Sequence, residues 1–106
     1  MLLKSEGDFD KGKFKKSVNS VFFRMRYASN QNSSRFGFII PKKIMSKVVD
    51  RNKVKRRLKS ILAENLPHIR NADVIYFPNQ KALTSNYQAL KTEVEKLLKQ
   101  AALWKE

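Results

Sequence analysis

The chain of 106 residues contains no cysteine, one histidine, three glycines, three prolines and only nine acidic residues. Without cysteine it can form no disulfide and use no thiolate, which fits a reducing compartment. No apolar run approaches the ~20 residues that a helix needs to span a membrane. Acidic residues enter the N-terminal stretch MLLKSEGDFD too early for a signal peptide. These absences make the cytoplasm the expected location.

Positive charge is abundant, because 23 Lys and Arg stand against nine Asp and Glu and give a net charge of +14. Such an excess is beyond what solubility requires and indicates a polyanionic partner. Nucleic acid is the leading candidate, since Lys and Arg neutralise phosphates and release counterions. An anionic membrane surface is the second. The length predicts a single domain over residues 1–106, and a hydrophobic fraction of 42% supplies a modest core.

The apolar pattern predicts an α+β fold with one sheet. Apolar alternation or a short apolar run predicts each strand, and apolar residues at helical spacing predict each helix. In chain order, the expected elements begin with a weak helix over 2–11 and two strands over 17–27 and 35–40. A long helix from 46 or 47 to 65 and a strand over 74–77 follow. A final helix is capped by Thr84 or Ser85.

Basic residues concentrate in residues 42–59, where nine of eighteen are Lys or Arg and one is acidic. In a helix at ~100° per residue, Val54, Leu58, Ile61 and Leu62 form one apolar stripe. The residues directly beside this stripe are Arg51, Asn52, Lys55, Arg56 and Lys59, whereas Lys53 and Arg57 fall on the far flank. A helix face that is merely solvated usually carries both positive and negative side chains. This face is almost entirely positive, which predicts phosphate binding.

The strand expected over 17–27 places Val21, Phe23, Met25 and Tyr27 on a core face. Phe22, Arg24 and Arg26 then share the opposite face. Two interpretations stay open: a helix covers this face with the arginines at its rim, or the face is a platform on which unstacked bases bind.

Side chains suited to protein catalysis are scarce. His68 lies in the turn after Pro67, and without a second His or any Cys a metal site is not expected. Glu93 and Glu95 stand two apart on the last helix and face different ways, so they do not form a catalytic pair. No glycine-rich phosphate loop is present. The sequence therefore predicts no catalytic residue in the protein and argues against a protein-only nuclease.

The segment RNKVKRRLK over residues 51–59 resembles the RNR signature of the bacterial ribonuclease P protein component. That signature reads approximately R-N-R-hydrophobic-K-R-R-L-R, after K-K and a short loop with A-V. Here Lys42-Lys43 and Val48-Val49 occupy those two places. Asp8-Phe9 is similar to the D-F of the family's first helix. Phe36-Gly37-Phe38 resembles the family's strand before K-K, and Asp73-Val74-Ile75 resembles its strand after the long helix. The third motif residue is Lys53 rather than Arg, which replaces a bidentate contact by a point charge.

The resemblance implies an α-β-β-β-α-β-α sandwich similar to the ribosomal protein S5 domain 2-like fold, with a left-handed β-α-β crossover. The additional strand would lie in residues 13–19. It implies the protein subunit of ribonuclease P, in which a large RNA with Mg²⁺ removes the 5′ leader of precursor tRNA and the protein alone is inactive. The implied partners are that RNA and precursor tRNA, with no membrane and no obligate protein partner.

The same resemblance implies site residues by motif position. Those expected to contact the catalytic RNA are Lys42, Lys43, Arg51, Asn52, Lys53, Lys55, Arg56 and Lys59. Phe9 matches a cleft aromatic of the family, and strand alternation adds Phe22 and Arg24 to a cleft for the leader. Mg²⁺ would be held mainly by the RNA subunit and the substrate, with no metal ligand assigned in the protein. From charge alone, the alternative is a ribosomal or other structured-RNA-binding protein with no role in cleavage.

Overall fold

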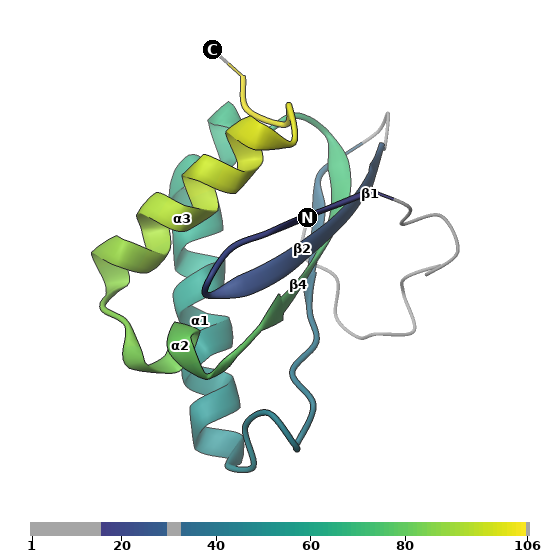
Figure 1. Ribbon diagram of the computed structural model, residues 1–106. Helices are drawn as coiled ribbons and strands as arrows, with labels where there is room; N and C mark the ends of the chain where they lie inside the picture. The colour runs from purple at the N-terminus through teal and green to yellow at the C-terminus, as the bar shows by residue number, and fades with distance from the viewer. Residues whose placement is uncertain (1–15, 30–32, 106) are drawn as a thin grey trace.

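The computed structural model describes residues 16–29 and 33–105, which form a four-stranded sheet with helices packed on one face (Figure 1). The elements are β1 (Lys16–Asn19), β2 (Phe23–Ser29), β3 (Arg35–Phe38), α1 (Val48–Asn65), a short 3-10 helix (Leu66–His68), β4 (Ala72–Pro78), α2 (Gln80–Thr84) and α3 (Tyr87–Gln100). The expected first helix, including Phe9, lies outside the described residues.

The strands lie in the order β1-β2-β4-β3. β1, β2 and β4 are antiparallel neighbours, whereas β3 runs parallel to β4 and is joined to it through α1. This parallel β-α-β unit inside an otherwise antiparallel sheet confirms the α+β fold that the sequence predicts. It also brings the loop before α1 to the end of the sheet where β4 finishes, as Figure 1 shows.

The stretch predicted as one strand over 17–27 is a hairpin of two strands. Ser20 makes the turn, since its Oγ accepts hydrogen bonds from the backbone N–H groups of Phe22 at 3.0 Å and Phe23 at 3.2 Å. Alternation fails inside the turn: Val21 is 59% exposed, and Phe22 packs half-buried against the main core. The predicted placement of Val21 in the core and of Phe22 beside Arg24 is therefore wrong. From Phe23 onward the alternation is confirmed.

The main core lies between the sheet and α1 and α3. The predicted stripe of α1 is fully buried, and burial contributes about 1.5–3 kcal/mol for each such side chain. Tyr76 of the central strand β4 lies against Phe23 edge-on at 5.2 Å and against Phe38 in a stack at 5.9 Å between ring centroids. Because α1 buries one stripe so completely, its opposite face is held toward solvent.

The N-cap of helix α3 lies one or two residues after the predicted Thr84 or Ser85. This N-cap is Asn86, whose Oδ1 accepts from the backbone N–H of Ala89 at 2.7 Å. Thr84 and Ser85 instead end α2, a short helix that the sequence did not predict and that Asn79 caps through the N–H of Lys81. The predicted apolar stripe of α3 is confirmed, with Leu90, Val94, Leu97 and Leu98 buried.

α3 ends in a left-handed turn of the Schellman type. Ala102 has φ 60°, its N–H donates to the Lys99 carbonyl at 3.1 Å, and the N–H of Leu103 donates to the Leu98 carbonyl at 2.8 Å. Leu103 and Leu98 are both buried, which supplies the apolar contact that accompanies this motif. The turn sends the last residues back toward the segment that follows α1.

We expect Ala102→Gly to raise the free energy of unfolding by about 0.5–1 kcal/mol, because glycine removes the Cβ that opposes the left-handed conformation. Urea unfolding measures the change. Ala101, with φ −82°, is the matched control, and glycine there should lower stability by a similar amount. A loss of stability in both variants would contradict this account of the turn.

Candidate nucleic-acid interface

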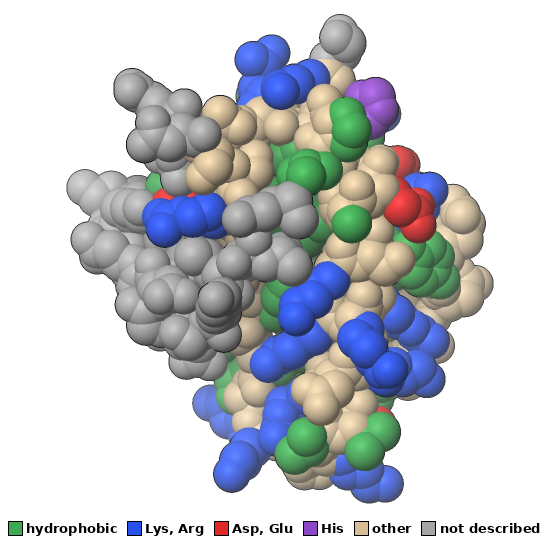
Figure 2. Space-filling model, turned by 180° about the vertical axis from the view of Figure 1, so that it is seen from behind, with side chains coloured by type: hydrophobic (Ala, Val, Ile, Leu, Met, Phe, Trp, Pro, Cys, Tyr) green, Lys and Arg blue, Asp and Glu red, His purple; other side chains and the backbone are tan. Residues whose placement is uncertain are grey.

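The solvent face of α1 is strongly basic. Val48–Asn65 contains six Lys or Arg, and its two acids stand apart, Asp50 in the first turn and Glu64 in the last. The exposed polar side chains of this face are Asn52, Lys53, Arg56 and Lys59, with Lys55 half-buried at its flank. Figure 2 shows Lys and Arg gathered over the lower half of the molecule, where Figure 1 has the N-terminal half of α1. A rigid row of cations of this kind matches a line of phosphates.

Two arginines of the motif are engaged by the protein's own backbone. Arg51 Nη1 donates to the carbonyls of Met45 at 2.7 Å and Ser46 at 3.2 Å, which ties α1 to the loop after β3. Arg57 Nη1 donates to the carbonyl of Ser85 at 3.0 Å and, more weakly, to that of Leu83 at 3.5 Å. A guanidinium has five N–H donors, so Arg51 can position the loop and still face an anion. The sequence did not reveal either structural role.

A shallow hollow of about 320 Å³ lies on the α3 side of this face and is lined by Lys53, Arg56, Arg57, Ser60 and Tyr87. The Tyr87 hydroxyl lies 3.0 Å from Ser60 Oγ and 2.8 Å from Glu64 Oε1. Three cations and two hydroxyl groups around one hollow form a suitable environment for a phosphate.

Glu64 limits the basic surface at the far end of α1. Lys91 Nζ lies 2.9 Å from its carboxylate, and hydrogen bonds from Lys91 and then Tyr87 lower the pKa of Glu64. The same carboxylate raises the pKa of Lys91. Both groups are therefore charged at neutral pH, and the acid is compensated locally rather than by the cations of Lys53 and Arg56.

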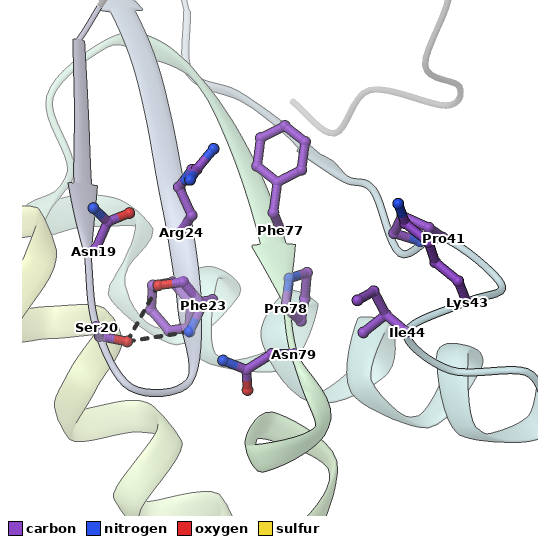
Figure 3. Close-up of a pocket in the computed structure, with 10 residues that line it drawn as sticks. All are labelled: Asn19, Ser20, Phe23, Arg24, Pro41, Lys43, Ile44, Phe77, Pro78 and Asn79. Carbon is purple, nitrogen blue, oxygen red and sulfur yellow. Dashed lines mark hydrogen bonds between the residues drawn. The ribbon is translucent and has the colours of Figure 1, made fainter.

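A second concave site, of about 410 Å³, lies where the β1–β2 turn, the end of β4 and the loop after β3 meet (Figure 3). Its lining residues are Asn19, Ser20, Phe23, Arg24, Pro41, Lys43, Ile44, Phe77, Pro78 and Asn79. Arg24 and Phe77 are register partners on β2 and β4, and Figure 3 shows both side chains pointing to the same side of the sheet. Lys43 adds a cation from the loop. The site thus combines an aromatic ring with two positive charges.

Backbone contacts hold the rim of this site. Asn79 Nδ2 donates to the Val21 carbonyl at 2.9 Å, and its backbone N–H donates to the Phe22 carbonyl at 3.0 Å. These bonds fasten the hairpin turn to the end of β4. The aromatic and cationic side chains therefore project from a fixed backbone, which limits the entropy lost when a ligand binds.

Among the residues that the structure describes, it brings together most of the predicted ones and separates Phe22 from them. The motif residues share α1, Lys42 and Lys43 are exposed in the preceding loop, and Arg24 lines the concave site with Lys43. Phe22 packs on the core, and Phe9 lies outside the described residues. The aromatic beside Arg24 is Phe77, which sequence analysis missed. The sequence did indicate the face on which Phe77 lies, because it follows the core residue Tyr76 by one position and strand alternation turns it away from the core.

The Ribonuclease P family model matches residues 1–102. The chain belongs to the ribonuclease P protein family. The ribonuclease P protein component of Mycoplasma mycoides is 34% identical over 90 residues, which cover 82% of each chain. That of Caldanaerobacter subterraneus is 36% identical over 95 residues, covering 86% of this chain and 79% of the relative.

Solved ribonuclease P proteins share the fold. The Staphylococcus aureus ribonuclease P protein superposes with a TM-score of 0.82 at 26% identity, covering 97% of this chain and 96% of that one. The Thermotoga maritima protein gives 0.73 at 25% identity over 80% of this chain and 82% of its own. The family predicted from the motif and the element order is confirmed.

Membership makes the chain a protein subunit of an endoribonuclease, and tRNA processing is the role of the ribonuclease P family. Among residues 16–29 and 33–105, no helix is long and apolar enough to cross a membrane. In the same part of the chain, no three His, Asp or Glu side chains gather into a possible metal site.

Proposed function

We propose that the solvent face of α1 binds the catalytic RNA of ribonuclease P and that the site around Arg24 and Phe77 contacts the single-stranded 5′ leader of precursor tRNA. The protein breaks no bond itself and supports a cleavage that the RNA performs with Mg²⁺. The observation that carries this proposal is the basic face of α1, which a fully buried apolar stripe anchors to the sheet.

The chemistry of this face suits a structured RNA. Arg56 can bind a phosphate through two parallel N–H donors, whereas Lys53 and Lys59 act as point charges that tolerate several geometries. All three are exposed, so binding requires no rearrangement of the core. Cations held on a rigid helix gain affinity because little conformational freedom is lost on binding.

The site around Arg24 suits an unpaired strand. Bases without a pairing partner stack on aromatic rings, and an adjacent guanidinium can hold the phosphate or stack as well. Phe77 supplies the half-buried ring and Arg24 the exposed guanidinium, directly opposite it across β2 and β4. This pair takes the place of the predicted Phe22 and Arg24.

Mg²⁺ prefers oxygen ligands, keeps several waters and is commonly held through phosphates. The described residues offer it no cluster of carboxylates, and the buried Asp73 already accepts two hydrogen bonds from Arg35. We therefore propose that the RNA subunit and the substrate hold the ion. The protein's cations reduce repulsion between the two RNAs, so less Mg²⁺ is needed for them to associate.

The test is cleavage of precursor tRNA by a bacterial ribonuclease P RNA at a low Mg²⁺ concentration. The purified protein should stimulate cleavage and show none without the RNA. Protein that binds this RNA but never stimulates cleavage would instead be a structured-RNA-binding protein. Cleavage by RNA-free protein would assign the chemistry to the protein and overturn the proposal.

We expect Phe77→Ala to weaken binding of leader-bearing precursor tRNA to the holoenzyme by about five-fold or more, because one base loses its stacking partner. Binding of tRNA without a leader should be unchanged. Phe22→Ala is the control: it removes a side chain that packs on the core, so it should lower stability without discriminating between the two substrates. Equal weakening of both substrates by Phe77→Ala would remove Phe77 from the leader site.

A further inference from the structure

The end of the molecule that carries the C-terminus holds an aromatic and basic cluster that belongs to neither site above. The rings of His68 and Trp104 stack with centroids 5.1 Å apart and an interplanar angle of 13°. Lys99 Nζ lies 5.2 Å from the centroid of the Trp104 ring. His68 is exposed and Trp104 is half-buried. We call His68 and Trp104 with Lys99 the C-terminal stack.

The backbone fixes this arrangement. After the left-handed turn at Ala102, the chain pairs with the segment that follows α1 through a bridge between Ile69 and Trp104. The N–H of Arg70 donates to the Leu103 carbonyl at 2.7 Å, and the N–H of Lys105 donates to the His68 carbonyl. Ile69 is buried, so this pairing is anchored in the core. The two rings are thus held in place before any ligand arrives.

Charge around the C-terminal stack is predominantly positive in the described residues. Arg70, Lys99 and Lys105 are all exposed beside or within the paired segments. Of the acids near the C-terminal stack in sequence, Glu64 is engaged by Lys91 and Tyr87, the buried Asp73 is paired with Arg35, and Glu95 lies one helical turn before Lys99. Securing the tail needs only the backbone pairing and the buried side of Trp104. That role does not need the exposed His68 ring or the cations around it. An unpaired base can stack on such a ring, and its phosphate can bind the neighbouring cations.

We infer that the C-terminal stack is a further RNA-binding site, which accepts an unpaired base on the outer face of His68 and its phosphate through Lys99 and Lys105. The inference rests on the proposed function of an RNA-binding subunit. At ~1.5 Å per α-helical residue and ~2 Å per 3-10 residue, Lys53 and His68 lie roughly 20–25 Å apart along α1 and the 3-10 helix that follows it. Figure 1 shows the C-terminal segment at the end of the molecule away from the start of α1. One RNA segment on the basic face therefore leaves this site open to a different segment.

Trp104 is the only tryptophan of the chain, so its fluorescence reports on this site alone. Ribonuclease P RNA and precursor tRNA are added separately to the full-length protein, which distinguishes the two sources of an unpaired base. One of them should change the Trp104 emission as it binds. His68→Ala should weaken binding of that RNA about five-fold or more, because the stacking surface is lost. His68→Tyr, which keeps a flat ring, should retain the affinity.

Thermal unfolding of both variants separates a binding effect from a folding effect, since His68 is exposed and its replacement should leave stability nearly unchanged. Unchanged Trp104 emission with both RNAs, together with equal affinity of His68→Ala and the original protein, would show that the C-terminal stack binds no RNA and would overturn the inference. That result would leave the proposed function intact as long as the protein still stimulates cleavage. Failure to bind either RNA would overturn the proposed function as well.

Discussion

Replacing Lys53, Arg56 and Lys59 together by alanine is expected to lower the affinity for ribonuclease P RNA about a hundred-fold. Each exposed cation–phosphate contact contributes roughly 1 kcal/mol, and three of them are lost. The negative slope of log K against log salt concentration should also become shallower, its magnitude decreasing by about 2 to 3, because fewer counterions are released on binding. Binding titrations over a series of salt concentrations measure both quantities.

The matched control is alanine at Lys16, Lys81 and Lys96, which removes the same charge from exposed positions outside α1. We expect less than about a five-fold loss of affinity, since only long-range attraction is weakened. Similar losses in the two triple variants would mean that net charge, rather than the face of α1, determines binding. Arg51→Ala is a less clear test, because Arg51 also holds the loop through the carbonyls of Met45 and Ser46.

Arg35→Met is expected to lower the free energy of unfolding by about 3 kcal/mol. Arg35 Nε and Nη2 donate to the two carboxylate oxygens of Asp73 at 2.8 and 2.7 Å, and the Asp73 side chain is 0% exposed. Removing the cation takes away a bidentate, charge-assisted pair from a buried carboxylate, which is a costly change. Urea unfolding at neutral pH measures the loss.

The double variant Arg35→Met with Asp73→Asn is the control for this pair. It removes the buried charge along with its partner, so it should be more stable than Arg35→Met alone. The two residues face each other across β3 and β4, just before and just after the crossover that contains α1. A loss below about 1 kcal/mol in the single variant would show that the pair does not hold this edge of the sheet.

Regular helices and strands were predictable from the sequence because their faces repeat with a local period. The stripe of Val54, Leu58 and Ile61 was enough to orient α1 and to place Lys53, Arg56 and Lys59 on its solvent side. Alternation likewise separated the buried Phe36 from the half-buried Arg35 in β3 and the buried Met25 from the exposed Arg24 in β2. The motif on α1 then identified the family, since its residues are contiguous in the chain.

Only the tertiary structure decided which aromatic accompanies Arg24. A turn held by the Ser20 side chain breaks the alternation and places Phe22 against the core. The pairing of β2 with β4 then brings Phe77, more than fifty positions later in the chain, beside Arg24. The same holds for Arg51, held by loop carbonyls, and for Trp104, stacked on His68. Local period determines which face of an element is buried. Turn hydrogen bonds and strand register determine which exposed residues meet, and no periodic signal in the sequence encodes them.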